Sequence, residues 1–164
     1  MPYYIIIRGP LGVGKSTIAQ ALAKRLGAFY VSMDDVLKQH GLDVVGNRPC
    51  IPAENFLKAD ELVLPQVKAE LKKRAVVFDG CFYHKEQLRH LEWALPSKHV
   101  VFDLKAPLDI CIRRDSKRER PYGEGAAKAV FALVSRFDYG IVIDTTKKTP
   151  VMCVEEMMTH LPKK

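Results

Sequence analysis

The sequence has no cysteine pair at the C-x-x-C spacing that zinc ribbons and redox dithiols use. Its four cysteines lie far apart, at positions 50, 81, 111 and 153, and no histidine stands at ligand spacing from them. These absences argue against a zinc site and against a disulfide framework. We therefore expect reduced, structural cysteines.

Long apolar runs are also missing, since no stretch approaches the roughly 20 residues of a membrane-spanning helix. The N-terminus lacks the order of basic, apolar and small residues of a secretory signal, and Tyr3 to Ile7 is typical of a strand. These two absences predict a cytoplasmic protein with no membrane partner.

A long basic run is absent too, although the net charge is +7. A basic surface is compatible with nucleic acid, yet an enzyme that holds ATP and a phosphorylated product also concentrates Lys and Arg. Charge alone therefore leaves the partner open. The 164 residues fit one domain, 1–164, with enough apolar side chains for a real core.

What the sequence does contain is the pattern G-x-x-x-x-G-K-[ST] between a strand and a helix. The strand before it is Tyr3 to Ile7, and the helix after it has an apolar face at Ile18, Leu22 and Leu26. This context predicts a P-loop that binds nucleotide phosphates through Gly9, Pro10, Leu11, Gly12, Val13, Gly14, Lys15, Ser16 and Thr17.

The chemistry of such a loop follows from its residue types. Glycines allow backbone N–H groups to face a phosphate, and the helix N-terminus adds the positive end of its dipole. We expect the Lys15 ammonium to contact the β- and γ-phosphates and the Ser16 hydroxyl to bind Mg²⁺. The expected cofactors are ATP and Mg²⁺.

Strand and helix patterns alternate along the whole chain, which predicts an α/β fold with a five-stranded parallel sheet and helices on both faces. The expected helices begin near 34, 53, 85, 107, 126 and 151, and Pro65 should kink or break the one at 53–74. The expected strands are 3–7, 28–32, 75–78, 99–104 and 140–143. Ligands of such folds bind at the carboxyl ends of the strands.

Acidic residues lie at the carboxyl ends of three of these strands or just after them. Asp34 and Asp35 could orient and deprotonate an acceptor hydroxyl, although Ser32 or Asp34 could instead cap the next helix. Asp79 and Asp103 each have the position of an Mg²⁺-binding carboxylate, or of a turn Asp. Neither is followed by Glu, which favours transfer to a hydroxyl acceptor over a dedicated ATPase.

Arginines dominate the segment 112–120. On a helix, Arg114 and Arg118 share one face and can clamp a transferring phosphoryl group. The alternative is a solvated helix in which Asp115 and Glu119 pair locally. The stretch 121–125 supplies the flexible exit of a short Arg-bearing lid.

Together these motifs resemble the small P-loop kinases that include shikimate kinase, chloramphenicol phosphotransferase and the kinase domain of bacteriophage polynucleotide 5′-kinase. The shared residues are Gly9 to Thr17, Asp34-Asp35, Val77 to Gly80 and the Arg114–Arg118 pair, across essentially the whole chain. The resemblance implies a P-loop NTPase fold.

By the same resemblance, Asp34 is the catalytic base or acceptor ligand and Arg114 and Arg118 are lid arginines. It also places 145–147, with Thr146, near the adenine. The glycine cluster by which shikimate kinases hold their substrate is replaced by Gly80-Cys81-Phe82-Tyr83. The acceptor is therefore not identified.

We expect an ATP-dependent phosphotransferase that acts on a hydroxyl acceptor, and a small molecule is favoured. One alternative is a polynucleotide 5′-hydroxyl kinase, so nucleic acid is a less favoured partner. Another is a nucleotide-dependent switch with slow ATP hydrolysis. A long basic groove leading to Asp34 would indicate nucleic acid, whereas a small pocket would indicate a metabolite.

Overall fold

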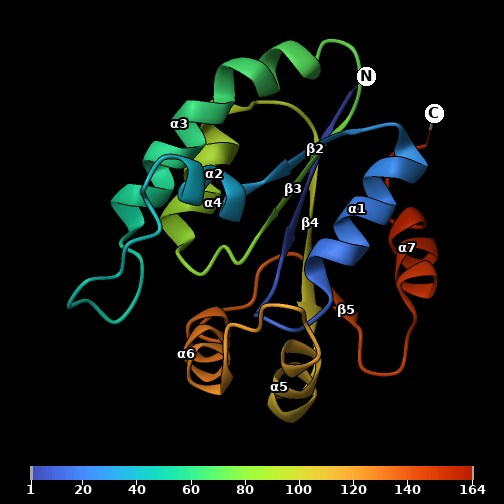
Figure 1. Cartoon of the computed structure of the whole chain (residues 1–164). Coiled ribbons are helices and arrows are strands. Elements are labelled where there is room, and N and C mark those ends of the chain that lie inside the picture. The colour runs from blue at the N-terminus through green and yellow to red at the C-terminus, as the bar shows by residue number, and fades with distance from the viewer. Residues whose placement is uncertain (1, 164) are drawn as a thin grey trace.

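The computed structural model describes residues 2–163 and has a central five-stranded sheet (Figure 1). All neighbouring strands are parallel, in the order β2-β3-β1-β4-β5. The strands are β1 (Tyr4–Arg8), β2 (Phe29–Ser32), β3 (Val76–Gly80), β4 (His99–Lys105) and β5 (Ile141–Asp144). The predicted fold is therefore confirmed.

Helices cover both faces of this sheet. In Figure 1, α1 and α7 lie on one side, α2, α3 and α4 on the other, and α5 and α6 near the carboxyl ends of the strands. Their bounds are α1 (Lys15–Leu26), α2 (Met33–Gln39), α3 (Ala53–Glu70), α4 (Lys85–Ala94), α5 (Leu108–Ser116), α6 (Glu124–Val134) and α7 (Pro150–Met158).

Strand β1 shows why both faces must be covered, because all five of its residues are buried. Tyr4 and Ile6 pack into the core beneath α3 and α4. Ile5 and Ile7 point the other way, into the core beneath α1 and α7. The alternation follows from the two-residue period of a strand, and it fixes the P-loop between the two cores.

Some predicted boundaries differ from the observed ones. β3 continues through Asp79 and Gly80, and β4 extends one residue further than predicted, to Lys105. Helix α3 ends at Glu70 but runs unbroken through Pro65. Pro65 and Glu61 are exposed, so the carbonyl group that proline leaves without a backbone donor can be hydrated by water. Within residues 2–163, no helix has the length and hydropathy to cross a membrane.

Candidate active site

The P-loop joins β1 to α1 and needs glycine at two positions with positive φ. Gly12 has φ 82° and Gly14 has φ 97°. A Cβ atom on Gly12 would lie 2.0 Å from the carbonyl oxygen of Cys111, so no side chain fits there. Gly14 is the N-cap of α1, whose amide groups and dipole therefore open toward the loop.

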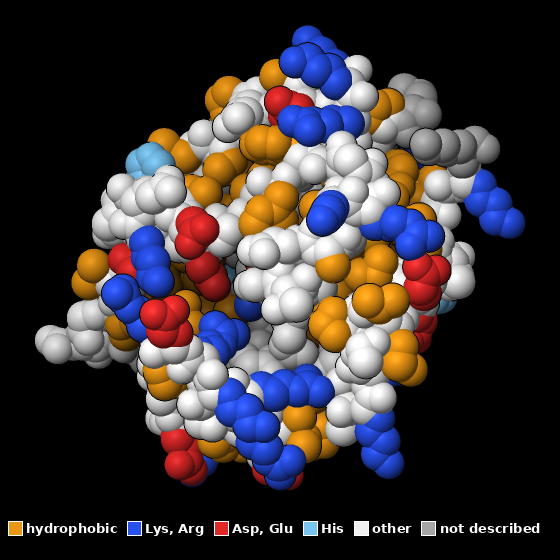
Figure 2. Space-filling model, turned by 45° about the vertical axis from the view of Figure 1, so that its right-hand side comes forward, with side chains coloured by type: hydrophobic (Ala, Val, Ile, Leu, Met, Phe, Trp, Pro, Cys, Tyr) orange, Lys and Arg blue, Asp and Glu red, His pale blue; other side chains and the backbone are white. Residues whose placement is uncertain are grey.

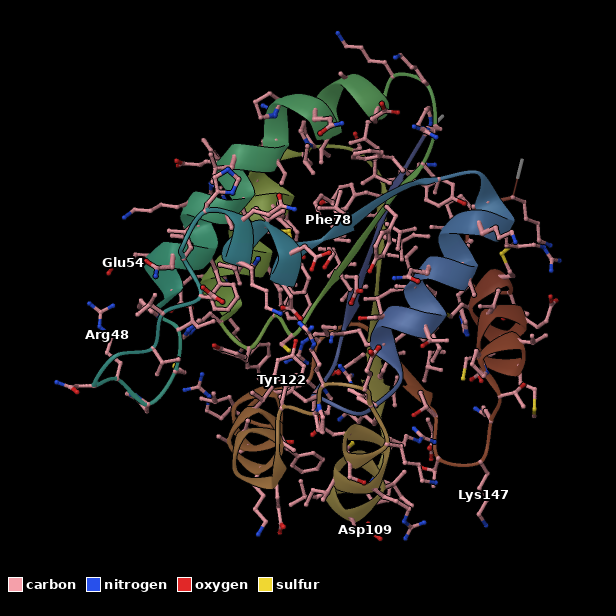
Figure 3. The ribbon with its side chains drawn as sticks, viewed as in Figure 1. Arg48, Glu54, Phe78, Asp109, Tyr122 and Lys147 are labelled. Atoms are coloured by element: carbon pink, nitrogen blue, oxygen red, sulfur yellow. The ribbon has the colours of Figure 1, made fainter. Side chains whose placement is uncertain are left out.

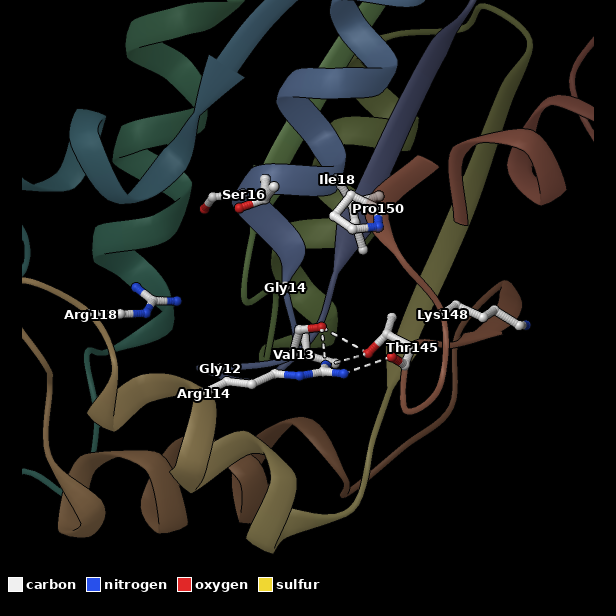
Figure 4. A pocket seen from close by; sticks show the side chains of 11 residues that line it. Gly12, Val13, Gly14, Ser16, Ile18, Arg114, Arg118, Thr145, Lys148 and Pro150 are labelled. Carbon is white, nitrogen blue, oxygen red and sulfur yellow. Dashed lines mark hydrogen bonds between the residues drawn. The ribbon is translucent and has the colours of Figure 1, made fainter. Parts of the chain in front are cut away.

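Arg114 holds this loop from below. Its Nη1 donates to the carbonyl oxygen of Val13 at 3.1 Å and to Thr145 Oγ1 at 2.9 Å. Its Nη2 donates to the carbonyl oxygens of Thr145 and Thr146 at 2.7 and 3.2 Å. The Thr145 hydroxyl also donates to Val13 O, at 2.8 Å. The Val13 carbonyl oxygen thus accepts from both Arg114 and Thr145 (Figure 4).

Arg118 lies apart from this network. Helix α5 ends at Ser116, so the expectation that Arg114 and Arg118 share one face of a continuous helix is wrong. Arg118 belongs to the turn that follows, with its Nε 3.7 Å from Asp115 Oδ1. In Figure 4 it approaches the same cavity from the opposite side and makes none of the drawn hydrogen bonds. Its guanidinium is therefore accessible to a phosphate.

Asp115 explains how the lid segment, residues 117–123, is anchored. Its buried carboxylate accepts hydrogen bonds from the backbone amides of Tyr122 at 3.2 Å and Gly123 at 2.9 Å. Both ends of the segment are thereby tied to the end of α5. Asp115 has this role instead of serving only as a surface partner in a solvated helix.

A cavity of about 490 Å³ lies over the P-loop. Figure 2 shows a hollow on this face with Lys and Arg side chains along its lower side. The cavity is lined by Gly12, Val13, Gly14, Ser16, Thr17, Ile18, Arg114, Arg118, Thr145, Lys148 and Pro150. Of the predicted nucleotide-binding set, Gly9, Pro10, Leu11 and Lys15 do not line it, and Thr145 lines it in place of Thr146.

Lys15 is buried at the floor of the site, with its Nζ 3.9 Å from Asp79 Oδ1. Burial by itself lowers the pKa of Lys15, but the negative fields of the Asp34 and Asp79 carboxylates oppose this effect and the pKa is raised. The Tyr30 hydroxyl donates to the other oxygen of Asp79. Lys15 therefore stays charged, as a phosphate ligand must.

Asp103, the alternative to Asp79, is committed elsewhere. Its Oδ2 accepts from Arg8 Nη1 at 2.8 Å and from the Tyr139 amide at 3.2 Å. Arg8 also donates to the carbonyl oxygens of Val134 and Phe137. Both charged side chains are fully buried. This ion pair ties the carboxyl ends of β1 and β4 to α6. Asp79, which faces Lys15 and Tyr30, is therefore the one of the two carboxylates that lies beside the P-loop.

Asp34 lines a second cavity, of about 290 Å³, between α2, α6 and the loop 41–52. Ser32 caps α2, because its Oγ accepts from the Asp35 amide at 3.3 Å, so the Asp34 carboxylate is not used as the cap. Asp35 is exposed and lines a different groove, beside β2. The structure thus separates the two adjacent carboxylates.

Comparison with known proteins identifies the family. A family model described as an AAA domain matches residues 5–129. A Pyrococcus abyssi protein named "Putative adenylate kinase" is 36% identical, over 94% of this chain and 81% of its own length. The chain belongs to the small P-loop kinases.

A second relative of this small P-loop kinase, and a solved structure with a similar fold, have other named activities. A shikimate kinase of Francisella tularensis subsp. novicida is 32% identical, over 69% of this chain and 63% of its own length. A sugar kinase of Janibacter sp. HTCC2649 has a TM-score of 0.78 and 18% identity, and covers 97% of this chain and 94% of that chain. These comparisons establish the family of the chain, but they do not identify the molecule that accepts the phosphate.

Sequence patterns missed several residues of this kinase site. Lys148 and Pro150, which were not predicted, line the cavity over the P-loop, and Thr145, which was expected near the adenine, donates a hydrogen bond to the P-loop. These residues come from the segment after β5, which contains no motif that predicts a contact with a loop more than a hundred residues away. In the sequence, only their position after a strand of the sheet indicates that they belong to the site.

Proposed function

We propose that this protein is an ATP-dependent phosphotransferase that moves the γ-phosphate of ATP to a hydroxyl group of a small molecule. The observation that carries the proposal is the arrangement of the two cavities around the P-loop. Gly12, Val13 and Gly14 line the first cavity, whereas Leu11 lines the second, together with Asp34. Donor and acceptor sites therefore share one loop.

Each charged group has a role in this scheme. Asp34 accepts the proton of the acceptor hydroxyl as that oxygen attacks the γ-phosphorus, and the bond from the γ-phosphorus to the leaving ADP oxygen breaks. Lys15 and Arg118 neutralise charge on the transferring group. Arg114 positions the P-loop and the segment after β5, since its four Nη hydrogen bonds leave only Nε–H for a ligand.

The residues also fit a magnesium ion bound with the nucleotide. Ser16 lines the nucleotide cavity, and Asp79 is a buried carboxylate beside Lys15. These two side chains, directly or through water, would hold Mg²⁺. When bound, the ion neutralises negative charge on the phosphate oxygens. Asp79 is assigned this role over Asp103 because Arg8 already neutralises Asp103.

The size of the second cavity favours a small molecule over a polynucleotide. About 290 Å³ is near the lower limit for small-molecule sites, roughly 300 Å³. Its lining contains one basic residue, Lys38, so no run of cations leads a nucleic-acid backbone to Asp34. A nucleotide-dependent switch remains the second candidate, favoured if Asp34 is dispensable.

An ATP-consumption screen tests the proposal. The wild-type protein and Lys15→Ala are incubated with Mg²⁺, ATP and pooled metabolites, with AMP, or with 5′-hydroxyl oligonucleotides. We expect ATP consumption above the acceptor-free rate in a metabolite pool, and none with Lys15→Ala. Turnover and ATP affinity within twofold of wild type in Lys15→Ala would remove the P-loop assignment. A slow rate that no acceptor raises would favour the switch.

A further inference from the structure

The second cavity carries little positive charge. Among the residues that line it, Lys38 is the single Lys or Arg, against the two carboxylates of Asp34 and Asp43. The Lys38 ammonium lies 5.8 Å from the centre of the Tyr122 ring. Burial raises the pKa of the Cys81 thiol to about 12, so this lining residue is neutral. A ligand in the cavity meets more negative than positive charge.

Three arginines lie near this cavity without lining it. Arg118 lies 5.5 Å from the centre of the Tyr122 ring, but it lines the cavity over the P-loop, where the transferring phosphate takes up its charge. Arg48 lies on the loop 41–52 but pairs with Glu54 at 3.3 Å, and both side chains are more than half exposed. Figure 3 shows this pair at the outer edge of the molecule, well away from Tyr122. Arg136 donates to the carbonyl oxygens of Tyr83 and Leu133, at 3.1 and 3.3 Å. None of the three guanidiniums lines the second cavity.

The remaining wall is apolar and aromatic. The rings of Phe56 and Tyr83 pack edge to face with their centroids 5.2 Å apart, and the Tyr83 hydroxyl oxygen accepts a hydrogen bond from the Ile51 amide at 3.1 Å. The apolar and aromatic lining residues are Leu11, Leu37, Val45, Pro49, Ile51, Phe56, Tyr83, Tyr122, Ala126, Ala129, Val130 and Leu133. Such a surface stabilises a ligand mainly by removing apolar area from water.

We propose that the acceptor is an alcohol with an apolar body and no anionic group. The inference rests on the proposed function, because it assumes that the acceptor hydroxyl lies beside Asp34. A nucleoside monophosphate or a sugar acid would place further negative charge among Asp34 and Asp43, with no arginine in the lining to bind it. An uncharged apolar body meets no such cost.

Two matched probes test the class of ligand. The first is 2-(1-naphthyl)ethanol, and the second is 1-naphthaleneacetate, which has the same rings and a carboxylate in place of the alcohol. Binding of each, and of AMP, is measured by titration calorimetry with the wild-type protein. We expect the alcohol to bind at least tenfold more tightly than either anion.

Two tryptophan variants of α6 show where the probe binds. Ala129 and Ala132 are both exposed, but only Ala129 lines the cavity. Ala129→Trp should weaken binding of the alcohol at least tenfold, whereas Ala132→Trp should leave it within twofold of wild type. Equal urea midpoints of the three proteins show that the fold is retained.

The inference is overturned if the alcohol fails to bind, if Ala129→Trp leaves its binding unchanged, or if either anion binds the cavity as tightly. AMP phosphorylated in preference to uncharged alcohols in the ATP screen would also overturn it while leaving the kinase intact. The opposite outcome is also distinguishable. If the protein phosphorylates no acceptor but binds the alcohol, and Ala129→Trp blocks this binding, the proposed kinase activity is rejected while the proposed class of ligand is retained.

Discussion

Arg114 should affect both the free energy of unfolding and the shape of the nucleotide site, so its replacement can be tested by a stability measurement. Replacing it with alanine removes four hydrogen bonds, to the carbonyl oxygens of Val13, Thr145 and Thr146 and to the Thr145 hydroxyl. These bonds join α5 to the P-loop and to the segment after β5. Without them, the hydrogen bond from the Thr145 hydroxyl to the Val13 carbonyl oxygen is left to connect these two walls of the cavity.

The expected loss can be worked out from these contacts. A net contribution of about 1 kcal/mol for each hydrogen bond, reduced because Arg114 is partly exposed, gives a decrease of about 2–4 kcal/mol in the free energy of unfolding. Arg114→Lys should recover less than half, since an ammonium lacks the planar fork that reaches several carbonyls at once. ATP binding should weaken together with stability, because the loop is no longer held in place.

Urea unfolding of the wild-type protein and both variants measures this decrease. Arg113→Ala is the matched control, because Arg113 is the exposed neighbour on the same helix and should change stability by less than about 0.5 kcal/mol. If Arg114→Ala unfolds at the same urea concentration as Arg113→Ala, the bracing role is refuted. Unchanged stability with lost turnover would instead restore Arg114 as a direct phosphate ligand.

Three further predictions concern charged groups. Arg118→Ala should lower turnover at least tenfold with little change in ATP affinity, because this guanidinium acts on charge that develops during transfer; equal losses in steady-state kinetics and ATP titration would contradict this. Asp103→Asn should cost about 3–5 kcal/mol in urea unfolding, since it leaves Arg8 buried without its counter-charge; a loss below about 1 kcal/mol would refute the pair's role. Burial raises the pKa of Asp60 to about 7 from 3.8. The folded state then holds a proton that the unfolded chain releases, so stability should fall as the pH rises from about 4 to about 7. Asp60→Asn should lack this decrease; parallel pH profiles in urea unfolding would contradict it.

The parts of the site that sequence could predict are those with local causes. The P-loop needs glycine where φ is positive, so Gly12 and Gly14 mark it in any context. The five strands could be found because β-branched and apolar runs buried on both faces differ from helical patterns. The positions of Asp34 and Asp79 follow from the rule that ligands bind at the carboxyl ends of parallel strands.

The parts that sequence could not predict depend on contacts between distant segments. An arginine pair four residues apart suggests one helix face, but the helix ends at Ser116 and the two guanidiniums diverge. Asp79 and Asp103 have the same local pattern, and only the approach of Arg8 distinguishes them. The charge of the second cavity likewise depends on how α2, α6 and the loop 41–52 pack together.

Asp34 is the residue on which the kinase mechanism depends, and Asp34→Asn tests it most directly. The amide keeps the shape of the side chain but cannot accept a proton, so ATP should bind as in the wild type while transfer to the acceptor found in the screen falls by about 10²-fold or more. Asp35→Asn is the matched control, since its side chain faces another groove and should have a milder effect. Transfer by Asp34→Asn at a near wild-type rate would contradict the mechanism.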